Sequence, residues 1–265
     1  PSTAGAMTVS LLALAALLLI PVQASVLAGS VAEGLKPETL LVVITGLDLG
    51  KAAVVRAAAA ALAVVLVLAL KPGRAAWIAA AALGALATAS LAWLGHGAAT
   101  EGSAGLVHLI SDILHSWAAA AWIGALVAFL LLLRTRRPSA EATAALHKAL
   151  HGFSGVGTLL VAVLGVTGVV NGWFLVGPAR LDGLWTTPYG RLLALKLLLV
   201  VAMLGLAAAN RFRLTPTLGR ALSDEGGPEA ALEALRRSVT VEMTLGFVVL
   251  ALVAWFGTLP PPAAH

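Results

Sequence analysis

Two histidines and an aspartate lie near the start of a long apolar segment, residues 105–133. On an α-helix, which turns about 100° per residue, His108, Asp112 and His115 fall within roughly 60° of one another and form one polar stripe. Imidazole nitrogens are common ligands for copper and zinc, and a nearby carboxylate can either ligate the ion or orient the ring. The spacing therefore predicts a metal site on one face of this helix.

The spacing also limits how such a site can be built. His108 and His115 lie about 10 Å apart along the axis, whereas a metal–nitrogen bond is about 2 Å long. We expect the ion at one of these histidines, with Asp112 as a ligand or an orienting group and with His96 or another helix supplying the missing ligands. A simpler interpretation stays open, in which both histidines lie at the outer interface of the membrane that the helix spans and only hydrogen-bond Asp112 and the backbone.

The composition points to a membrane protein. Of the 265 residues, 60% are hydrophobic and 11% are charged, and the mean hydropathy is +0.98. In a soluble domain about a quarter of the residues are charged. The basic residues that give the net charge of +5 lie in short loops between apolar runs, which excludes nucleic acid as the expected partner. The chain has no cysteine, so any metal must be bound by other groups.

Seven apolar runs are long enough to span a bilayer, and backbone hydrogen bonding in lipid requires each to be helical. We predict an all-α, polytopic transmembrane bundle that forms a single membrane domain over residues 1–265. Its longest loops, 134–153 and 211–238, are expected on the cytoplasmic side. The first run could instead be a signal peptide. The runs cover residues 8–29, 52–70, 75–94, 105–133, 154–176, 190–210 and 239–258.

The orientation follows from the distribution of lysine and arginine. Six of the 17 fall on the side opposite the N-terminus and the other eleven on the same side, which predicts that the N-terminal side is cytoplasmic. The polar stripe, His96 and the C-terminus are then expected on the outer side. The six are Lys36, Lys51, Arg56, Arg180, Arg191 and Lys196.

Several other polar or aromatic residues within the apolar runs are candidates for a pathway or for support of the site. Trp122 continues the stripe about 10 Å deeper. Arg56 and Lys196 are expected to reach the outer surface or to pair with Asp48 or Asp112. Glu242 either pairs with Arg236 or Arg237 at the inner surface or ends a cation or proton route. Asn171 is a further buried polar group, and His147 with His151 is expected to form only an interfacial turn.

Four segments together resemble the copper resistance protein D (CopD) family of bacterial inner-membrane proteins. They are HxxxxxxHxxAxAxWIG from His108 to Gly124, FSGVGTLLVAVLGVTGVVNGWFLVG from Phe153, TPYGRLLALKLLL from Thr187 and NRFRLTP from Asn210. The resemblance implies a copper-handling protein in which His108 and His115 are the matching histidines, often with a periplasmic CopC-like copper-binding partner. Many relatives have eight spans, one more than the seven predicted here.

Three functions remain open from the sequence. The first is copper capture at the periplasmic face and import, with the oxidation state, Cu(I) or Cu(II), undecided. The second is a periplasm-facing copper delivery protein that does not translocate the ion. The third is a b-type haem electron carrier, which would need His96, His265 or a methionine as a second axial ligand. We find no catalytic motif and expect no enzyme activity, and the oligomeric state is open.

Overall fold

A computed structural model of the protein describes residues 20–22, 24–69, 73–93, 102–134, 139–222 and 227–264. Within these ranges the chain forms helices and no strand, which confirms the predicted all-α polytopic bundle. Six helices are long and apolar enough to cross a membrane. They are Asp48–Leu66, Arg74–Trp93, Gly102–Leu133, Ala140–Leu175, Pro188–Ala221 and Glu229–Phe256. The first expected run, 8–29, falls mostly outside the described residues.

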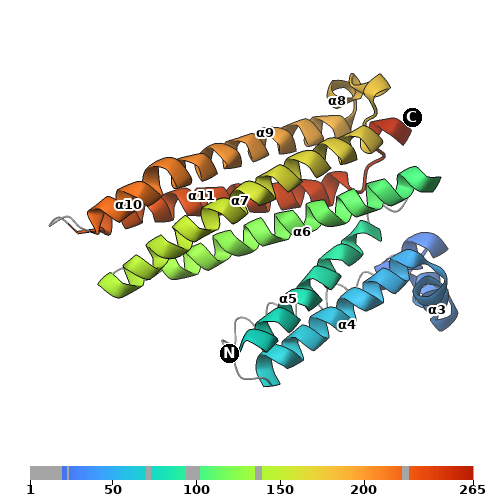
Figure 1. Ribbon diagram of the computed structural model, residues 1–265. Helices are drawn as coiled ribbons and strands as arrows, with labels where there is room; N and C mark the ends of the chain where they lie inside the picture. The colour runs from blue at the N-terminus through green and yellow to red at the C-terminus, as the bar shows by residue number, and fades with distance from the viewer. Residues whose placement is uncertain are drawn as a thin grey trace. The chain divides into compact units, whose positions relative to one another are not determined.

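The chain divides into two compact units, and the division falls within one helix, between Trp117 and Ala118. In the N-terminal unit, α4 and α5 lie side by side (Figure 1). The indole N–H of Trp117 donates to the carbonyl of Ala85, 2.8 Å away, and so ties the first half of α6 to α5. The elements of this unit are α2 (Val31–Gly34), α3 (Pro37–Gly46), α4 (Asp48–Ala69), α5 (Arg74–Ala89), the 3₁₀ turn η1 (Ser90–Trp93) and the first half of α6 (Gly102–Leu133).

The C-terminal unit holds the longest helices, and its α9 and α11 pack along each other (Figure 1). Its elements are the second half of α6, α7 (Ala140–Leu175), η3 (Pro178–Arg180), α8 (Gly183–Thr186), α9 (Pro188–Ala209), the π-helical turn η4 (Asn210–Leu214), α10 (Thr215–Ala221), α11 (Glu229–Phe256) and η5 (Pro262–Ala264). Because α9, η4 and α10 follow without a break, they form one helical rod of 34 residues.

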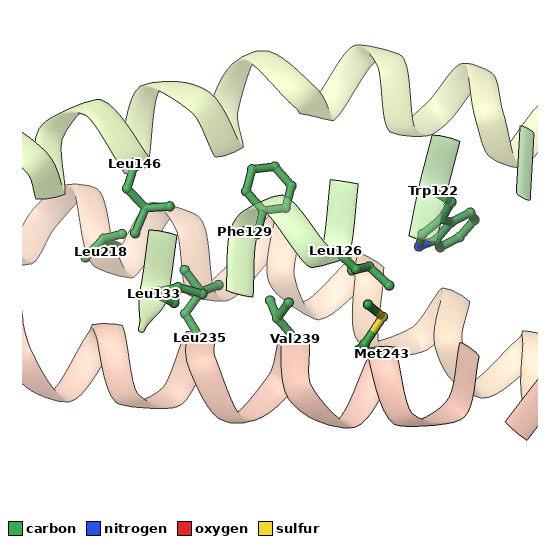
Figure 2. Packing of buried hydrophobic residues seen from close by; sticks show 9 residues of the cluster. All are labelled: Trp122, Leu126, Phe129, Leu133, Leu146, Leu218, Leu235, Val239 and Met243. Carbon is green, nitrogen blue, oxygen red and sulfur yellow. The ribbon is translucent and has the colours of Figure 1, made fainter. Parts of the chain in front are cut away.

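An apolar cluster fills the space between α6, α7, α10 and α11 (Figure 2). Phe129 of this cluster also meets Phe153 of α7 edge to face, with ring centroids 5.4 Å apart. We call it the apolar cluster: Trp122, Leu126, Phe129, Leu133, Leu146, Leu218, Leu235, Val239 and Met243.

The start of α9 agrees with what TTPYG predicts, a helix that Thr187 caps and that begins at about Pro188. The hydroxyl of Thr187 accepts a hydrogen bond from the N–H of Gly190 at 3.0 Å, and Pro188 occupies the first helical position. Tyr189, 2% exposed, packs edge to face on Phe256 of α11 with centroids 5.0 Å apart. A Cβ at Gly190 would lie 2.0 Å from the carbonyl oxygen of Gly183, so only glycine lets α8 pack this closely on α9.

The helices extend well beyond the apolar runs. In α7 the helix begins at Ala140, with the Ser139 hydroxyl accepting from the Ala142 N–H as an N-cap, so the second half of the expected loop 134–153 is helical. Likewise α10 and the first turns of α11 occupy much of the expected loop 211–238. The short helix α3 was not expected. Hydropathy marks only the part of a helix that suits hydrocarbon, whereas a capped helix continues into polar surroundings.

Candidate functional site

The polar stripe of His108, Asp112 and His115 lies in the first half of α6. The side chain of His108 is only 2% exposed, and Asp112 and His115 are half-buried. Ser111, beside Asp112, is buried as well. All three stripe residues have interaction partners in the structure. The stripe therefore faces protein rather than the exterior, as a polar group on a spanning helix should.

The stripe does not by itself make a complete metal site. Among the described residues, no three His, Asp or Glu side chains come close enough together to hold one ion. His96, the residue expected to complete the set, lies outside the described residues. His108 and His115 also lie about 10 Å apart along the axis, which is an awkward geometry for one ion bound by both.

A second polar site lies deeper, and three helical segments contribute to it. Glu242 on α11 is 2% exposed, and its Oε1 accepts a hydrogen bond from the indole N–H of Trp122 on α6 at 2.9 Å. Its Oε2 accepts from the side-chain amide of Asn210 on η4, also at 2.9 Å. We call these three residues the glutamate centre. Two side-chain hydrogen bonds to one carboxyl group therefore join α6, η4 and α11.

A widened helical turn places Asn210 at this centre. Residues Asn210–Leu214 form a π-helical turn, in which the N–H of Thr215 bonds to the carbonyl of Asn210. Pro216 follows directly; it has no N–H, and its ring would clash with the carbonyl four residues earlier in a regular α-helix. The π turn accommodates the proline within an unbroken rod, and such turns occur frequently at functional sites.

A glycine sets the spacing of the helices one turn beyond Glu242. A Cβ at Gly246 would lie 2.6 Å from the end of Ile123 on α6 and 3.5 Å from the methyl group of Met203 on α9. The absence of a side chain therefore lets α11 approach both helices beside Trp122. This approach brings the indole N–H within hydrogen-bonding distance of the carboxylate.

The interfacial ion pair considered for Glu242 is not found. Arg236 pairs instead with Glu233, one turn earlier on the exposed side of α11. Glu242 follows the start of α11 by thirteen residues, which is about 20 Å of helix, and its partners are neutral. The buried residues of α11 lie along one face of the helix. Glu242 is on this face, so its side chain points into the bundle and away from Arg236 and Arg237.

The other candidate residues have contacts of their own. Arg56 on α4 donates from Nε to the Ser90 hydroxyl at 2.9 Å and from Nη2 to the Ser90 carbonyl at 3.0 Å, while Asp48 pairs with Lys51. Asn171 lies on α7 and Lys196 on α9; both are half-buried and both have interaction partners. Arg56 thus links α4 to η1.

The His147 and His151 rings lie one helical turn apart on α7, with centroids separated by 6.4 Å. The Nε2 atom of His147 lies 2.7 Å from the position that a Cβ would take at Gly219 on α10. The ring therefore fills the space above this glycine, as an interfacial packing residue would.

Comparison with known proteins places the chain in a family. The family sequence model described as "Copper resistance protein D" matches residues 147–256, and the one described as "Copper resistance protein D-like, N-terminal domain" matches residues 2–106. Copper resistance protein D of Pseudomonas syringae pv. tomato is 41% identical over 220 residues, which cover 82% of this chain and 70% of that protein. The chain belongs to the copper resistance protein D family.

A second relative of the family is more distant. Inner membrane protein YebZ of Escherichia coli K12 is 32% identical over 172 residues, 64% of this chain, and the match spans about half of that protein, 55%. No solved structure matches the chain.

The two polar sites differ in how far the family models cover them. Asn210 and Glu242 lie inside the copper resistance protein D match, whereas the polar stripe and Trp122 lie between the two matched stretches. The family motifs also have visible structural roles, because TPYG builds the capped start of α9 and NRFRLTP builds the π turn.

Sequence analysis named Asn210 only as the first residue of the NRFRLTP segment and missed its role. The signal was present, since a proline six residues after an asparagine, within an otherwise helical stretch, indicates a distorted turn. The partner of that asparagine could not be derived from the sequence, because Glu242 follows 32 residues later on another helix.

Proposed function

We propose that the protein binds copper at the periplasmic face of a bacterial inner membrane and moves it towards the cytoplasm. The observation that carries this proposal is a stripe of one buried imidazole, a half-buried carboxylate and a half-buried imidazole on a spanning helix, in a family named for copper resistance. Ionisable groups inside a membrane bundle are costly, so their presence there favours a functional role. Copper is the cargo in this proposal, and no catalytic step is required.

The proposed capture site uses one histidine of the stripe at a time. Asp112 reaches His108 or His115 and acts as a ligand or holds the ring, and His96 completes the set. Imidazole with carboxylate suits Cu(II), and two imidazoles suit Cu(I), so this ligand set accepts either oxidation state. Transfer of the ion between His108 and His115 would be a step of about 10 Å along the helix.

The proposed inward route continues along α6. Trp122 lies seven residues beyond His115, and the carboxylate of Glu242 beside it supplies negative charge. Lys196, Asn171 and Arg56 lie on other helices, and in this proposal they have supporting roles. Of these, Arg56 would act through η1, to which it is hydrogen-bonded.

A second candidate is copper delivery at the periplasmic face without translocation. The apolar cluster favours it, because the second half of α6 beyond Trp122 buries only Leu126, Phe129 and Leu133 (Figure 2). No described side chain of the cluster offers a ligand other than Met243. Delivery would require a soluble partner, for which a periplasmic CopC-like copper-binding protein is the natural choice in either candidate function.

The location is part of the proposal. A chain with six membrane-length helices that is related to an inner membrane protein is placed in the cytoplasmic membrane as a multi-pass protein. The excess of Lys and Arg on the N-terminal side directs the polar stripe and the C-terminus to the periplasm.

The test combines copper binding with copper uptake. Copper bound to purified protein and copper accumulated by expressing cells are measured by elemental analysis for wild type, His108→Ala, His115→Ala and the matched control His151→Ala. Import predicts that stripe variants lose both bound and accumulated copper, while His151→Ala behaves as wild type.

The other outcomes separate the alternatives. Bound copper without accumulation in wild type would support delivery and exclude import. Wild-type protein that binds no copper, or stripe variants that bind as much copper as wild type, would contradict the proposed capture site.

A further inference from the structure

The glutamate centre holds a carboxylate in an unusual setting. Glu242 is 2% exposed within a membrane-length helix, and both its hydrogen-bond partners, the Trp122 indole and the Asn210 amide, are neutral. Burial of a charge is costly when no opposite charge offsets it, whereas burial of a neutral carboxylic acid is much less so. The setting therefore favours a group that can change its charge.

No cation in the described ranges compensates Glu242 from the elements that pack around it. On η4, Arg211 turns to α7, where it donates to the Ser154 carbonyl and the Thr158 hydroxyl. On α11 itself, Arg236 pairs with Glu233 and Arg237 is exposed. The remaining titratable or charged groups on α6, α7, α9, η4 and α10 are seven or more residues from the centre along their helices, exposed, or engaged elsewhere. They are His108, Asp112, His115, Arg134, Glu141, His147, Lys148, His151, Tyr189, Arg191, Lys196, Arg213 and Arg220.

The Asn210 amide can satisfy either charge state of Glu242. Its N–H donates to the carboxylate, while its Oδ1 atom is buried and has no hydrogen-bond partner within the described structure. Because the two ends of an amide are almost equal in shape, rotation by half a turn exchanges them. The Oδ1 atom would then accept the O–H of a protonated Glu242, and the Trp122 N–H would still donate to the other oxygen.

A second buried atom without a hydrogen-bond partner in the described structure supports this rotation of the Asn210 amide. Ser238 precedes Glu242 by one turn on the same face of α11, and its hydroxyl oxygen is buried and unpartnered in the described structure. A hydroxyl both donates and accepts, so it provides polar capacity beside the centre in either state. Unsatisfied buried atoms are rare in proteins, and one on a hydrogen-bond partner of Glu242 and another one helical turn away on α11 call for an explanation.

We propose that Glu242, Trp122 and Asn210 form a proton-binding site inside the helical bundle. One proton adds to a carboxylate oxygen of Glu242, converting the anion into a neutral acid, and leaves again to water; no electron is exchanged. Asn210 donates to the anion and, after rotation of its amide, accepts from the acid. Proton binding needs no copper, and only a coupling of the two would rest on the proposed function.

The test reads the charge of Glu242 through its hydrogen-bonded neighbour. The protein is labelled with 5-fluorotryptophan and followed by ¹⁹F NMR in lipid nanodiscs without copper, from acidic to alkaline pH. The seven tryptophans give seven resonances, and Trp122→Phe assigns one of them. We expect the Trp122 resonance to shift with pH as a single-proton transition that disappears in Glu242→Gln and persists in the matched control Glu233→Gln.

Glu242→Asp keeps the test decisive if the glutamine variant does not fold. A shorter carboxylate still titrates but with altered hydrogen bonds, so the transition should persist with a displaced midpoint. The proposal is overturned by a Trp122 resonance that does not move with pH in wild type, by a transition retained in Glu242→Gln, or by an unchanged midpoint in Glu242→Asp. Loss of copper binding or uptake in the earlier experiment would leave these results unaffected.

Discussion

The two polar sites are built in opposite ways. The polar stripe comes from a single helix, where seven residues of α6 separate His108 from His115. The glutamate centre joins three helical segments, with Trp122 and Glu242 separated by 120 residues in the chain. A site on one helix is fixed by local geometry and needs outside ligands, whereas a site across three segments is complete and holds the fold together. The proposed exchange of copper fits the first construction, and the proposed binding of a proton fits the second.

The largest effect should come from Glu242→Leu. This change leaves the Trp122 and Asn210 donors buried without an acceptor, at about 1–3 kcal/mol each, and should lower the free energy of unfolding by about 2–6 kcal/mol. Reversible unfolding in mixed micelles would measure it. A loss below about 0.5 kcal/mol would show that the glutamate centre does not stabilise the packing of the three segments. The contrast between this centre and the polar stripe would then disappear.

Asp112→Asn should act on metal rather than on stability. Loss of a carboxylate that ligates copper or orients its histidine typically lowers metal affinity about 10–100-fold. Copper titration of the purified protein, with unfolding measured in parallel, tests whether affinity falls while stability stays close to wild type. An unchanged affinity would reduce the stripe to a structural feature.

Trp122→Phe removes one donor and keeps an aromatic ring in the apolar cluster. We expect a loss of about 1–2 kcal/mol in unfolding free energy, since Glu242 keeps Asn210 as a partner. The double variant with Glu242→Leu should lose less than the sum of the two single variants, because both changes remove the same hydrogen bond. Additive losses would show that the bond contributes nothing.

The smallest effect is expected for Glu233→Gln. Glu233 pairs with Arg236 on the exposed side of α11, and exposed ion pairs contribute about 0–1 kcal/mol. The same unfolding measurement should give a difference below about 0.5 kcal/mol. A larger loss would mean that charge on α11 matters generally, and that the glutamate centre is not special.

The sequence predicted what depends on local patterns. Apolar runs predicted the helical membrane fold, Thr187 and Pro188 predicted the start of α9, and the spacing of His108, Asp112 and His115 predicted one shared face of α6. Trp122 and Glu242 were each predicted to contribute to a pathway, but no contact between them was predicted. Their contact depends on the close approach of α11 at Gly246, which arises from tertiary packing and leaves no local pattern.

The depth of the glutamate centre has an electrical consequence. Trp122 precedes Arg134 by twelve residues of continuous α6, about 18 Å of a hydrocarbon core that is about 30 Å thick. With Arg134 at the inner surface, as the sequence predicts, a charge at Glu242 lies well inside the transmembrane field. One elementary charge crossing the whole membrane gains or loses about 2.3 kcal/mol per 100 mV. Over the roughly 18 Å between Arg134 and Trp122, the energy of the charge therefore changes by about 1.4 kcal/mol for each 100 mV. An energy of about 1.4 kcal/mol changes the ratio of protonated to ionised Glu242 about tenfold. The membrane voltage would therefore help to set the charge that Glu242 carries.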